Sequence, residues 1–200
     1  MRTSDFDYEL PPELIAQEPA EPRDSARLLI LDRASGSLRH AVVRDLADLL
    51  APGDLLARLE ARGVGVARLV LHIGLDTFRP VEGDDLAGHA IHREWYVVPD
   101  DVQKQLKAAK RVIAVGTTTV RALETWAATA QSEGWTDLFI LPGFQFQVVD
   151  GLLTNFHLPR STLLMLVSAF AGRERILAAY AEAVREGYRF YSFGDAMLLR

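Results

Sequence analysis

The stretch of this sequence richest in chemically useful side chains runs from Leu152 to Gly172, where a polar cluster directly precedes an apolar run. Asn155 and His157 belong to the cluster, and Ser161 stands where it would cap the helix that follows. The N-terminus of that helix would turn unpaired N–H groups and the positive end of its dipole toward the cluster. Such an arrangement suits the carboxylate, phosphate or ribose oxygens of a ligand, and a capped core helix after a loop is the equally simple alternative.

A second candidate site is the sequence AVGTTTVRALE, an apolar strand that ends in Gly116 and is followed by a helix beginning in threonines. Open α/β sheets bind ligands at such places, at the carboxyl end of a strand beside a helix N-terminus. Gly116 would allow a ligand to approach the backbone, and Thr117 and Thr118 would offer hydroxyls. Arg121 and Glu124 lie three residues apart on one helical face and would pair with each other. The alternative is a helix cap followed by a surface ion pair.

Histidines are concentrated in GHAIHREWY, which contains His89, His92 and Glu94. Alternate residues of a strand share a face, so His92 and Glu94 would lie together as a general acid/base pair. A metal site would instead use His89, His92 and His157 as ligands, with Glu94 as base. The H-x-x-H spacing is not the i, i+4 spacing of helical zinc sites, so we expect no metal. Histidines bonded within a turn are a third possibility.

Two further segments carry candidate groups. LVLHIGLDTFRP places His72 in an apolar strand and Thr77 in the following loop, and YRFYSFGDAM sets Asp195 beside a glycine and several aromatic rings. Aromatic rings next to a carboxylate can hold a base and a ribose. The alternatives are a core histidine bonded to a backbone carbonyl and a last strand that closes the sheet.

Composition limits the class of protein. The chain has 200 residues, 49% hydrophobic and 24% charged, which fits one domain spanning 1–200. The net charge of −5 argues against a generally cationic nucleic-acid surface but leaves room for a local basic patch. The chain contains no cysteine, which excludes disulfides and thiol nucleophiles. The N-terminus does not resemble a secretion signal, and no apolar run approaches ~20 residues, so we expect a cytoplasmic protein that does not enter the membrane.

The elements that would position these groups alternate between strand and helix. The N-terminal loop EPAEPRDSAR is expected to be fixed, with Arg23, Asp24 and Arg27 directed into the molecule. A hairpin is predicted over 28–43, and the other predicted strands cover 66–74, 91–98, 111–116, 138–141 and part of 146–156. Helices are predicted near 44–51 and over 55–63, 101–110, 117–130, 161–170 and 175–186. Strands that are apolar on both faces indicate an α/β fold with a mostly parallel sheet, or a flattened α/β barrel, surrounded by helices.

Several blocks of the sequence, in order, resemble the S-adenosylmethionine:tRNA ribosyltransferase-isomerase family of queuosine biosynthesis. They are FDYELPPELIAQEPAEPRDSARLLILDR, LHIGLDTFRPV, HAIHREWYVVP, RVIAVGTTTVRALE, LPGFQFQVVDGLLTNFHLPRSTLLMLVSAFAG and YRFYSFGDAM, and they cover nearly the whole chain. Asp76 stands where the family pattern has glycine. The chain also lacks a segment that family members have. After GDLL they continue with an N-D-T-R-V type motif, an inserted β-barrel domain and a P-T-A-G-L-H-F type motif. Here GDLL runs directly into ARLEARGV, which places an apparent deletion junction near 56–57.

The resemblance implies that the chain transfers and isomerises the ribosyl part of S-adenosylmethionine onto 7-aminomethyl-7-deazaguanine at the wobble position of a tRNA anticodon. The product is epoxyqueuosine in tRNA, and adenine and methionine are released. S-adenosylmethionine is then a cosubstrate, no metal is needed, and we expect a monomer. A noncatalytic tRNA- or nucleoside-binding remnant is the alternative because of the missing segment, and a histidine-based metal hydrolase is a more distant one.

Within the matching blocks, side-chain chemistry suggests roles. His92 with Glu94 would be the acid/base pair, and Asp195 a second candidate base. Catalytic His157 would orient the ribose together with two other polar groups, Asn155 and Ser161. The remaining expected substrate-binding residues are His72, Thr77, Gly116, Thr117, Thr118 and Arg121.

Overall fold

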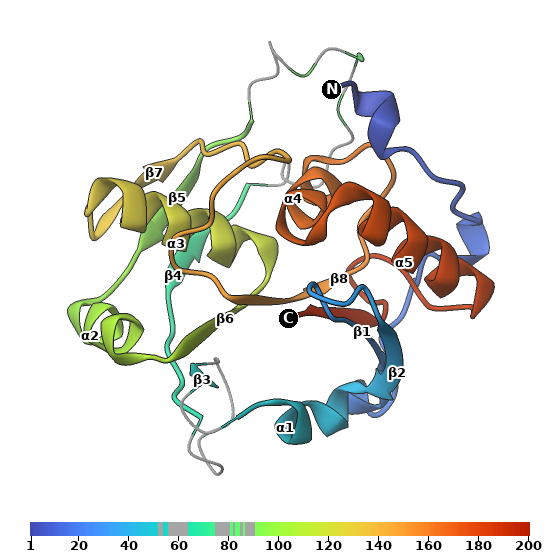
Figure 1. Cartoon of the computed structure of the whole chain (residues 1–200), viewed down its shortest axis with the longest axis horizontal. Coiled ribbons are helices and arrows are strands. Elements are labelled where there is room, and N and C mark those ends of the chain that lie inside the picture. Colours follow the sequence, from blue (N-terminus) through green and yellow to red (C-terminus); the bar gives the residue numbers. More distant parts are fainter. Residues whose placement is uncertain (52–53, 56–63, 75–80, 82, 85, 87–90) are drawn as a thin grey trace.

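The structure is a computed structural model that describes residues 1–51, 54–55, 64–74, 81, 83–84, 86 and 91–200. Within these residues two β-sheets are surrounded by helices (Figure 1). The larger sheet has the strand order β2-β1-β9-β8-β6-β3. Its strands are β1 (Arg27–Leu31), β2 (Leu38–Val42), β3 (Asp54–Leu55), β6 (Arg111–Val115), β8 (Gly151–Asn155) and β9 (Ala196–Leu199).

The larger sheet is mixed, which confirms the α/β class and refines the expected strand directions. The pairs β1–β9, β6–β8 and β3–β6 are parallel, whereas β1–β2 and β8–β9 are antiparallel. Since β9 and β1 run opposite to β6 and β8, their amino ends lie at the edge where β6 and β8 end. Polar residues before β9 and β1 are thereby brought to the same edge as those after β6 and β8.

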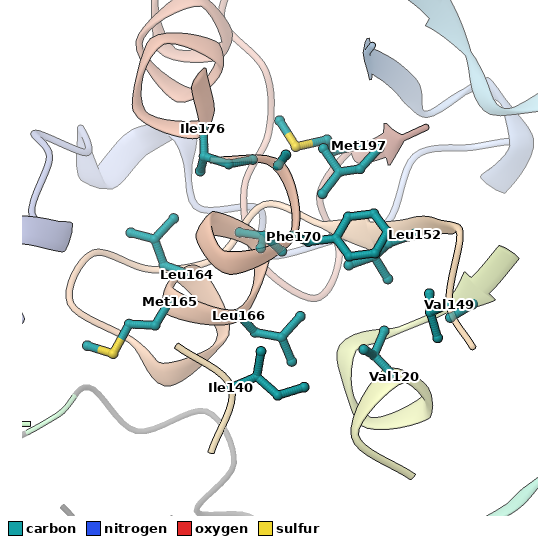
Figure 2. Packing of buried hydrophobic residues seen from close by; sticks show 14 of the residues in the cluster. Val120, Ile140, Val149, Leu152, Leu164, Met165, Leu166, Phe170, Ile176 and Met197 are labelled. Atoms are coloured by element: carbon teal, nitrogen blue, oxygen red, sulfur yellow. The ribbon is translucent and has the colours of Figure 1, made fainter. Parts of the chain in front are cut away.

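Both faces of the larger sheet are covered, as the alternation of side chains along β1 shows. Leu29 and Leu31 belong to the main core beneath the long helices, whereas Leu28 and Ile30 belong to a smaller cluster that includes Leu46 of α1. The main core joins side chains of α3, α4, α5, β8 and β9 (Figure 2). This explains why the strands read as continuous apolar runs.

The smaller sheet is antiparallel, with the order β4-β5-β7. Its strands are β4 (Val70–His72), β5 (Glu94–Val97) and β7 (Glu133–Thr136). The strand predicted over 66–74 is present only as β4, and the expected burial was wrong, because Val70 is half exposed at the edge of this sheet.

The predicted strand over 138–141 is also absent. Main-chain groups of Leu138 are paired with side chains instead of a neighbouring strand: its N–H donates to Oγ1 of Thr136 and its carbonyl accepts from Nε of Arg121. These bonds satisfy the main chain of Leu138 without a neighbouring strand, and the segment packs into the core, where Ile140 is buried.

The helices follow the predicted pattern closely. They are α1 (Leu46–Leu49), α2 (Asp100–Ala108), α3 (Thr117–Thr129), α4 (Thr162–Ala171) and α5 (Arg173–Arg185). The helix predicted over 55–63 falls almost wholly outside the described residues, and Asp54–Leu55 pair with β6 as strand β3. None of the helices in the described ranges has the length and apolar character needed to cross a bilayer.

Candidate functional site

The carboxyl ends of β6 and β8 lie side by side and form the centre of the site. The N–H of Gly116 donates to the carbonyl of Leu153 at 2.8 Å, which continues the strand pairing by one residue. Gly116 then turns into α3 with a φ of +88°, a conformation that disfavours other residues. An added Cβ at this position would meet no atom within 4 Å, so the backbone here stays open to a ligand.

The described residues line two neighbouring pockets at this edge. The first, which we call the threonine pocket, has a volume of about 220 Å³. It is lined by residues of five segments: Leu71 and Ile73, Val115–Thr119, Thr154–His157, Leu163, and Tyr191–Ser192. The structure thus brings together the threonines of α3, the polar end of β8 and the aromatic segment near the C-terminus, which the sequence had suggested separately.

The second, the arginine pocket, has a volume of about 530 Å³. It is lined by Arg23, Asp24, Val43, Val115, Gly116, Leu153, Thr154, Asn155 and Ala196. The two pockets share the residues at the ends of β6 and β8, namely Val115, Gly116, Thr154 and Asn155. They therefore form two adjoining lobes at one strand edge.

His157 is fixed at the wall of the threonine pocket. Its backbone N–H donates to the hydroxyl of Tyr180 at 3.0 Å, and its carbonyl accepts from the hydroxyl of Tyr8. Its Nε2 lies 3.2 Å from Oγ1 of Thr154. Burial lowers the pKa of His157 to about 3, so the imidazole is neutral at physiological pH. A neutral, immobile imidazole can donate or accept a hydrogen bond but cannot supply a positive charge.

Tyr191 has a backbone conformation that non-glycine residues rarely adopt, with a φ of +72°. Its N–H donates to the carbonyl of Phe156 at 3.1 Å, and its own carbonyl accepts from the N–H of Gly194. Strain of this kind persists only where the surroundings impose it, and it is concentrated at functional sites. The strained residue lines the threonine pocket, which supports that pocket as the ligand site.

Arg121 pairs with Glu94 rather than with Glu124, so the expected pairing within α3 was wrong. Nη1 of Arg121 donates to Oε2 of Glu94 at 2.5 Å, and both side chains are buried. The guanidinium also donates to the carbonyls of His92 and Leu138. It holds the smaller sheet against α3 and is committed to protein acceptors, so this geometry does not present Arg121 to a substrate anion.

Glu124 has a different structural task. Its carboxylate accepts three backbone N–H groups, from Gln147, Val148 and Val149, at 2.8 to 3.1 Å. The segment before β8 therefore has its donors satisfied by a side chain of α3. Helical spacing alone favoured a pair with Arg121, but buried backbone donors from a distant segment compete more effectively.

Asp195 and Ser161, two predicted site residues, bind the backbone. Oδ1 of Asp195 accepts from the N–H of Arg27 and Oδ2 from the N–H of Arg189, each at 2.8 Å. Oγ of Ser161 accepts from the N–H of Leu164 and caps α4. Asp195 as a base and Ser161 as a ribose contact are therefore not favoured by this geometry. Both residues position the chain around the pockets.

His72 is exposed, so it is not a core histidine, and it lines neither of the two pockets described above. Leu71 and Ile73, its neighbours on either side, line the threonine pocket, so the alternation of a strand turns His72 to the opposite face. His92 is half-buried and precedes β5, outside the pocket-lining residues described above. Thr77 and His89 lie outside the described residues. Within the described ranges no three metal-binding side chains are grouped.

Sequence reasoning missed several pocket residues, chiefly the apolar ones. Val115 and Ile73 are 41% and 50% exposed, which is unusual for residues of apolar strands. Both line the threonine pocket and supply the apolar surface on which a planar base could lie. No local pattern distinguishes them from core residues. The conformation of Tyr191 likewise has no signal in the sequence.

Comparison with known proteins gives the same family along the whole chain. The family model described as "Queuosine biosynthesis protein" matches residues 3–57 and 54–199. A Rubrobacter xylanophilus protein named S-adenosylmethionine:tRNA ribosyltransferase-isomerase is 36% identical, in an alignment that takes in 100% of this chain and 98% of the relative. A Thermotoga maritima protein of the same name is 34% identical, with 100% of both chains covered.

A solved structure agrees. The crystal structure of an S-adenosylmethionine tRNA ribosyltransferase from Thermotoga maritima superposes with a TM-score of 0.83, at 34% identity, over 98% of this chain and 100% of that chain. Sequence and fold therefore lead to one conclusion: the chain belongs to the queuosine biosynthesis protein family.

Proposed function

We propose that this chain is an S-adenosylmethionine:tRNA ribosyltransferase-isomerase. It transfers and isomerises the ribosyl moiety of S-adenosylmethionine onto 7-aminomethyl-7-deazaguanine in tRNA, which gives epoxyqueuosine and releases adenine and methionine. The family match over both ends of the chain carries this proposal, together with a pocket at the strand edge where open α/β sheets bind nucleotides.

The reaction needs a site that fixes a nucleoside while its sugar rearranges. In the threonine pocket the open backbone of Gly116 and the hydroxyl of Thr117 are proposed to bind hydroxyl or ring-nitrogen groups. The hydroxyl of Thr118, which donates to Oε1 of Glu94 at 3.4 Å, is proposed to accept from a ligand hydroxyl. Asn155 and neutral His157 are proposed to orient the ribose, because they are fixed hydrogen-bonding groups without charge. Preorganised donors of this kind stabilise charge that develops on a leaving group.

We propose that one of the two residues expected to transfer protons, His92 or Glu94, has a positioning role instead. His92 stays the proposed proton carrier, and Glu94 becomes a residue that positions it, since the Glu94 carboxylate is bound to Arg121 and that same guanidinium holds the His92 carbonyl. His92→Ala and His157→Ala test the two histidines. Unchanged turnover in both variants would contradict the assignment.

Residues 1–200 are proposed to form one α/β domain with the deletion junction near 56–57. The two family-model segments meet at 54–57, and the alignment with the Rubrobacter protein spans 326 residues, far more than the 200 present here. The inserted β-barrel domain expected of the family is proposed to be missing at this point. A single cooperative unfolding transition would support one domain, and two separate transitions would contradict it.

The decisive experiment is incubation of the 200-residue chain with S-adenosylmethionine and a tRNA carrying 7-aminomethyl-7-deazaguanine at the wobble position. Adenine release, measured by chromatography, is expected only when both substrates are present. We further propose that the chain works as a cytoplasmic monomer without a metal, and turnover unchanged by a chelator would support the last point.

A noncatalytic tRNA- or nucleoside-binding remnant is the second candidate, and the interrupted family match favours it. Such a protein would bind S-adenosylmethionine or the tRNA with measurable affinity and yet release no adenine. Binding and turnover measured on the same preparation separate the two functions.

A further inference from the structure

The arginine pocket contains two adjacent residues of opposite charge. Arg23 and Asp24 stand in the short 3-10 turn Arg23–Ser25 that precedes β1, and both line the pocket. The remaining wall is largely apolar and includes Val43, Val115, Leu153 and Ala196. A cation and an anion side by side at an apolar pocket are the features that recognise a zwitterion with an aliphatic chain.

The turn that carries these charges is held by the segment before β9. Nη1 of Arg23 donates to the carbonyl of Gly194 at 3.3 Å. Gly194 has no space for a side chain, because a Cβ would lie 2.3 Å from the carbonyl oxygen of Arg189. Asp195 binds the N–H of Arg27, just after the turn. These contacts hold the backbone on either side of the turn, and one hydrogen bond to Gly194 ties the Arg23 guanidinium to it while leaving its other N–H groups for a ligand.

Asp24 has a competing partner that a ligand can displace. Its Oδ1 lies 3.8 Å from Nη2 of Arg44, and both side chains are more than half exposed. Ion pairs of this length and exposure contribute little. An ammonium group that enters the pocket can therefore take the place of Arg44.

We propose that the arginine pocket binds the methionine end of S-adenosylmethionine, with Arg23 on the α-carboxylate and Asp24 on the α-ammonium. A carboxylate bound by a guanidinium makes short, charge-assisted hydrogen bonds. The adenosine end then occupies the threonine pocket. This inference rests on the proposed function, because it divides that function's cosubstrate between the two lobes.

The volumes and the shared residues support this division. Small-molecule sites usually measure ~300–1,000 Å³, so the threonine pocket, at about 220 Å³, is too small for a nucleoside joined to an amino acid. The arginine pocket adds about 530 Å³. Gly116, Thr154 and Asn155 line both lobes, so the ribose and the sulfonium lie over these three residues. Their carbonyl and side-chain oxygens suit a positively charged sulfur.

Two unreactive ligands test the inference by calorimetry: S-adenosylhomocysteine, which keeps the amino-acid end, and 5′-methylthioadenosine, which lacks it. Arg23→Gln is expected to lower the affinity for S-adenosylhomocysteine ~10–100-fold, the usual effect of losing a charged hydrogen bond. It should leave the affinity for 5′-methylthioadenosine unchanged. Arg39→Gln, a charge-matched change on exposed β2, should affect neither ligand.

Asp24→Asn is the second variant, and it too should lower the affinity only for S-adenosylhomocysteine, the ligand that has the amino-acid end. Equal loss on both ligands, or no loss on S-adenosylhomocysteine, overturns the inference. Loss of tRNA affinity alone also overturns it, since Arg23 would then bind a phosphate. A different outcome is that the two substitutions selectively weaken binding of S-adenosylhomocysteine while the unsubstituted chain releases no adenine in the turnover assay. In that case the proposed function fails and the division of the site between the two ligand ends stands.

Discussion

Arg121 and Glu94 form a buried ion pair that links α3 to the smaller sheet, with 2.5 Å between Nη1 and Oε2. The exposed fractions of the two side chains are 2% and 0%, so neither charge can be solvated if its partner is removed. The guanidinium also binds the carbonyl of His92. Loss of this pair should therefore affect both stability and the placement of His92.

Glu94→Gln is expected to lower the free energy of unfolding by ~3–5 kcal/mol, because it leaves the Arg121 charge buried without its counterion. Urea denaturation followed by circular dichroism measures this change. Arg185→Gln is the control, because it removes the surface ion pairs of the exposed Arg185 side chain with Glu182 and Glu186 and should leave the midpoint nearly unchanged. Similar small effects of both substitutions would show that the buried pair is not a major contributor.

His157 predicts a dependence of stability on pH. Its pKa is about 3 in the folded chain against an ordinary 6.5, because of burial. The unfolded chain therefore takes up a proton below pH 6.5 that the folded chain refuses until about pH 3, and stability falls as the pH falls through this window. Lowering the pH from 7 to 5 should therefore reduce the free energy of unfolding by ~2 kcal/mol through His157.

The measurement is the free energy of unfolding of the unsubstituted chain and of His157→Asn at both pH values. The loss on acidification should be smaller in the variant by that amount. Equal losses in the two proteins would mean that His157 titrates normally when folded.

Two glycines near the pockets should respond differently to alanine. At Gly194 a Cβ would lie 2.3 Å from the carbonyl oxygen of Arg189, so Gly194→Ala should be severely destabilising, by more than ~3 kcal/mol. At Gly116 the space is open, but its φ of +88° and ψ of 146° belong to a region that essentially only glycine adopts, so Gly116→Ala should cost ~1–3 kcal/mol. Thermal unfolding of both variants tests the order. A larger effect at Gly116 would contradict the packing described here.

The threonines at the start of α3 give a matched pair for ligand binding. Both Thr117 and Thr119 line the threonine pocket, but the hydroxyl of Thr119 already donates to the carbonyl of Val115 at 2.8 Å, whereas Thr117 is buried at the pocket wall. Thr117→Val should weaken binding of 5′-methylthioadenosine ~2–10-fold, the usual range for one neutral hydrogen bond. Thr119→Val should have a smaller effect. Titration calorimetry checks both, and a greater loss at Thr119 would reverse the assignment.

Much of the fold was predictable because it depends on local periodicity. The hairpin β1–β2 and the helices α2, α3, α4 and α5 follow from apolar spacing and turn residues, and the structure confirms them. The predicted strand over 138–141 was wrong, and an apolar run cannot reveal that Arg121 and Thr136 bind the main-chain groups of Leu138 at its start. Strand propensity is a local property of a segment and does not identify the distant groups that bind its backbone.

The candidate site divides in the same way. The segments around Gly116, Asn155 and His157 were identified from the sequence because turn-forming and polar residues interrupt apolar runs there, and the structure brings them to one pocket. The sequence did not reveal the partners of Arg121, Glu124 and Asp195, because each of these side chains binds a segment that is distant in sequence. A carboxylate looks the same in the sequence whether it will bind a proton, an arginine or a backbone N–H.

The sequence by itself determined the α/β class, the order of most elements and the family, since periodicity and long motifs are written locally along the chain. Only the tertiary structure decided which strands run antiparallel. That reversal of β9 and β1 places Arg23 and Asp195 at the edge where β6 and β8 end. The physical reason is that strand direction depends on which segments pair across the sheet, as β9 does with both β1 and β8, and these partners are distant in sequence, so no short segment encodes the choice.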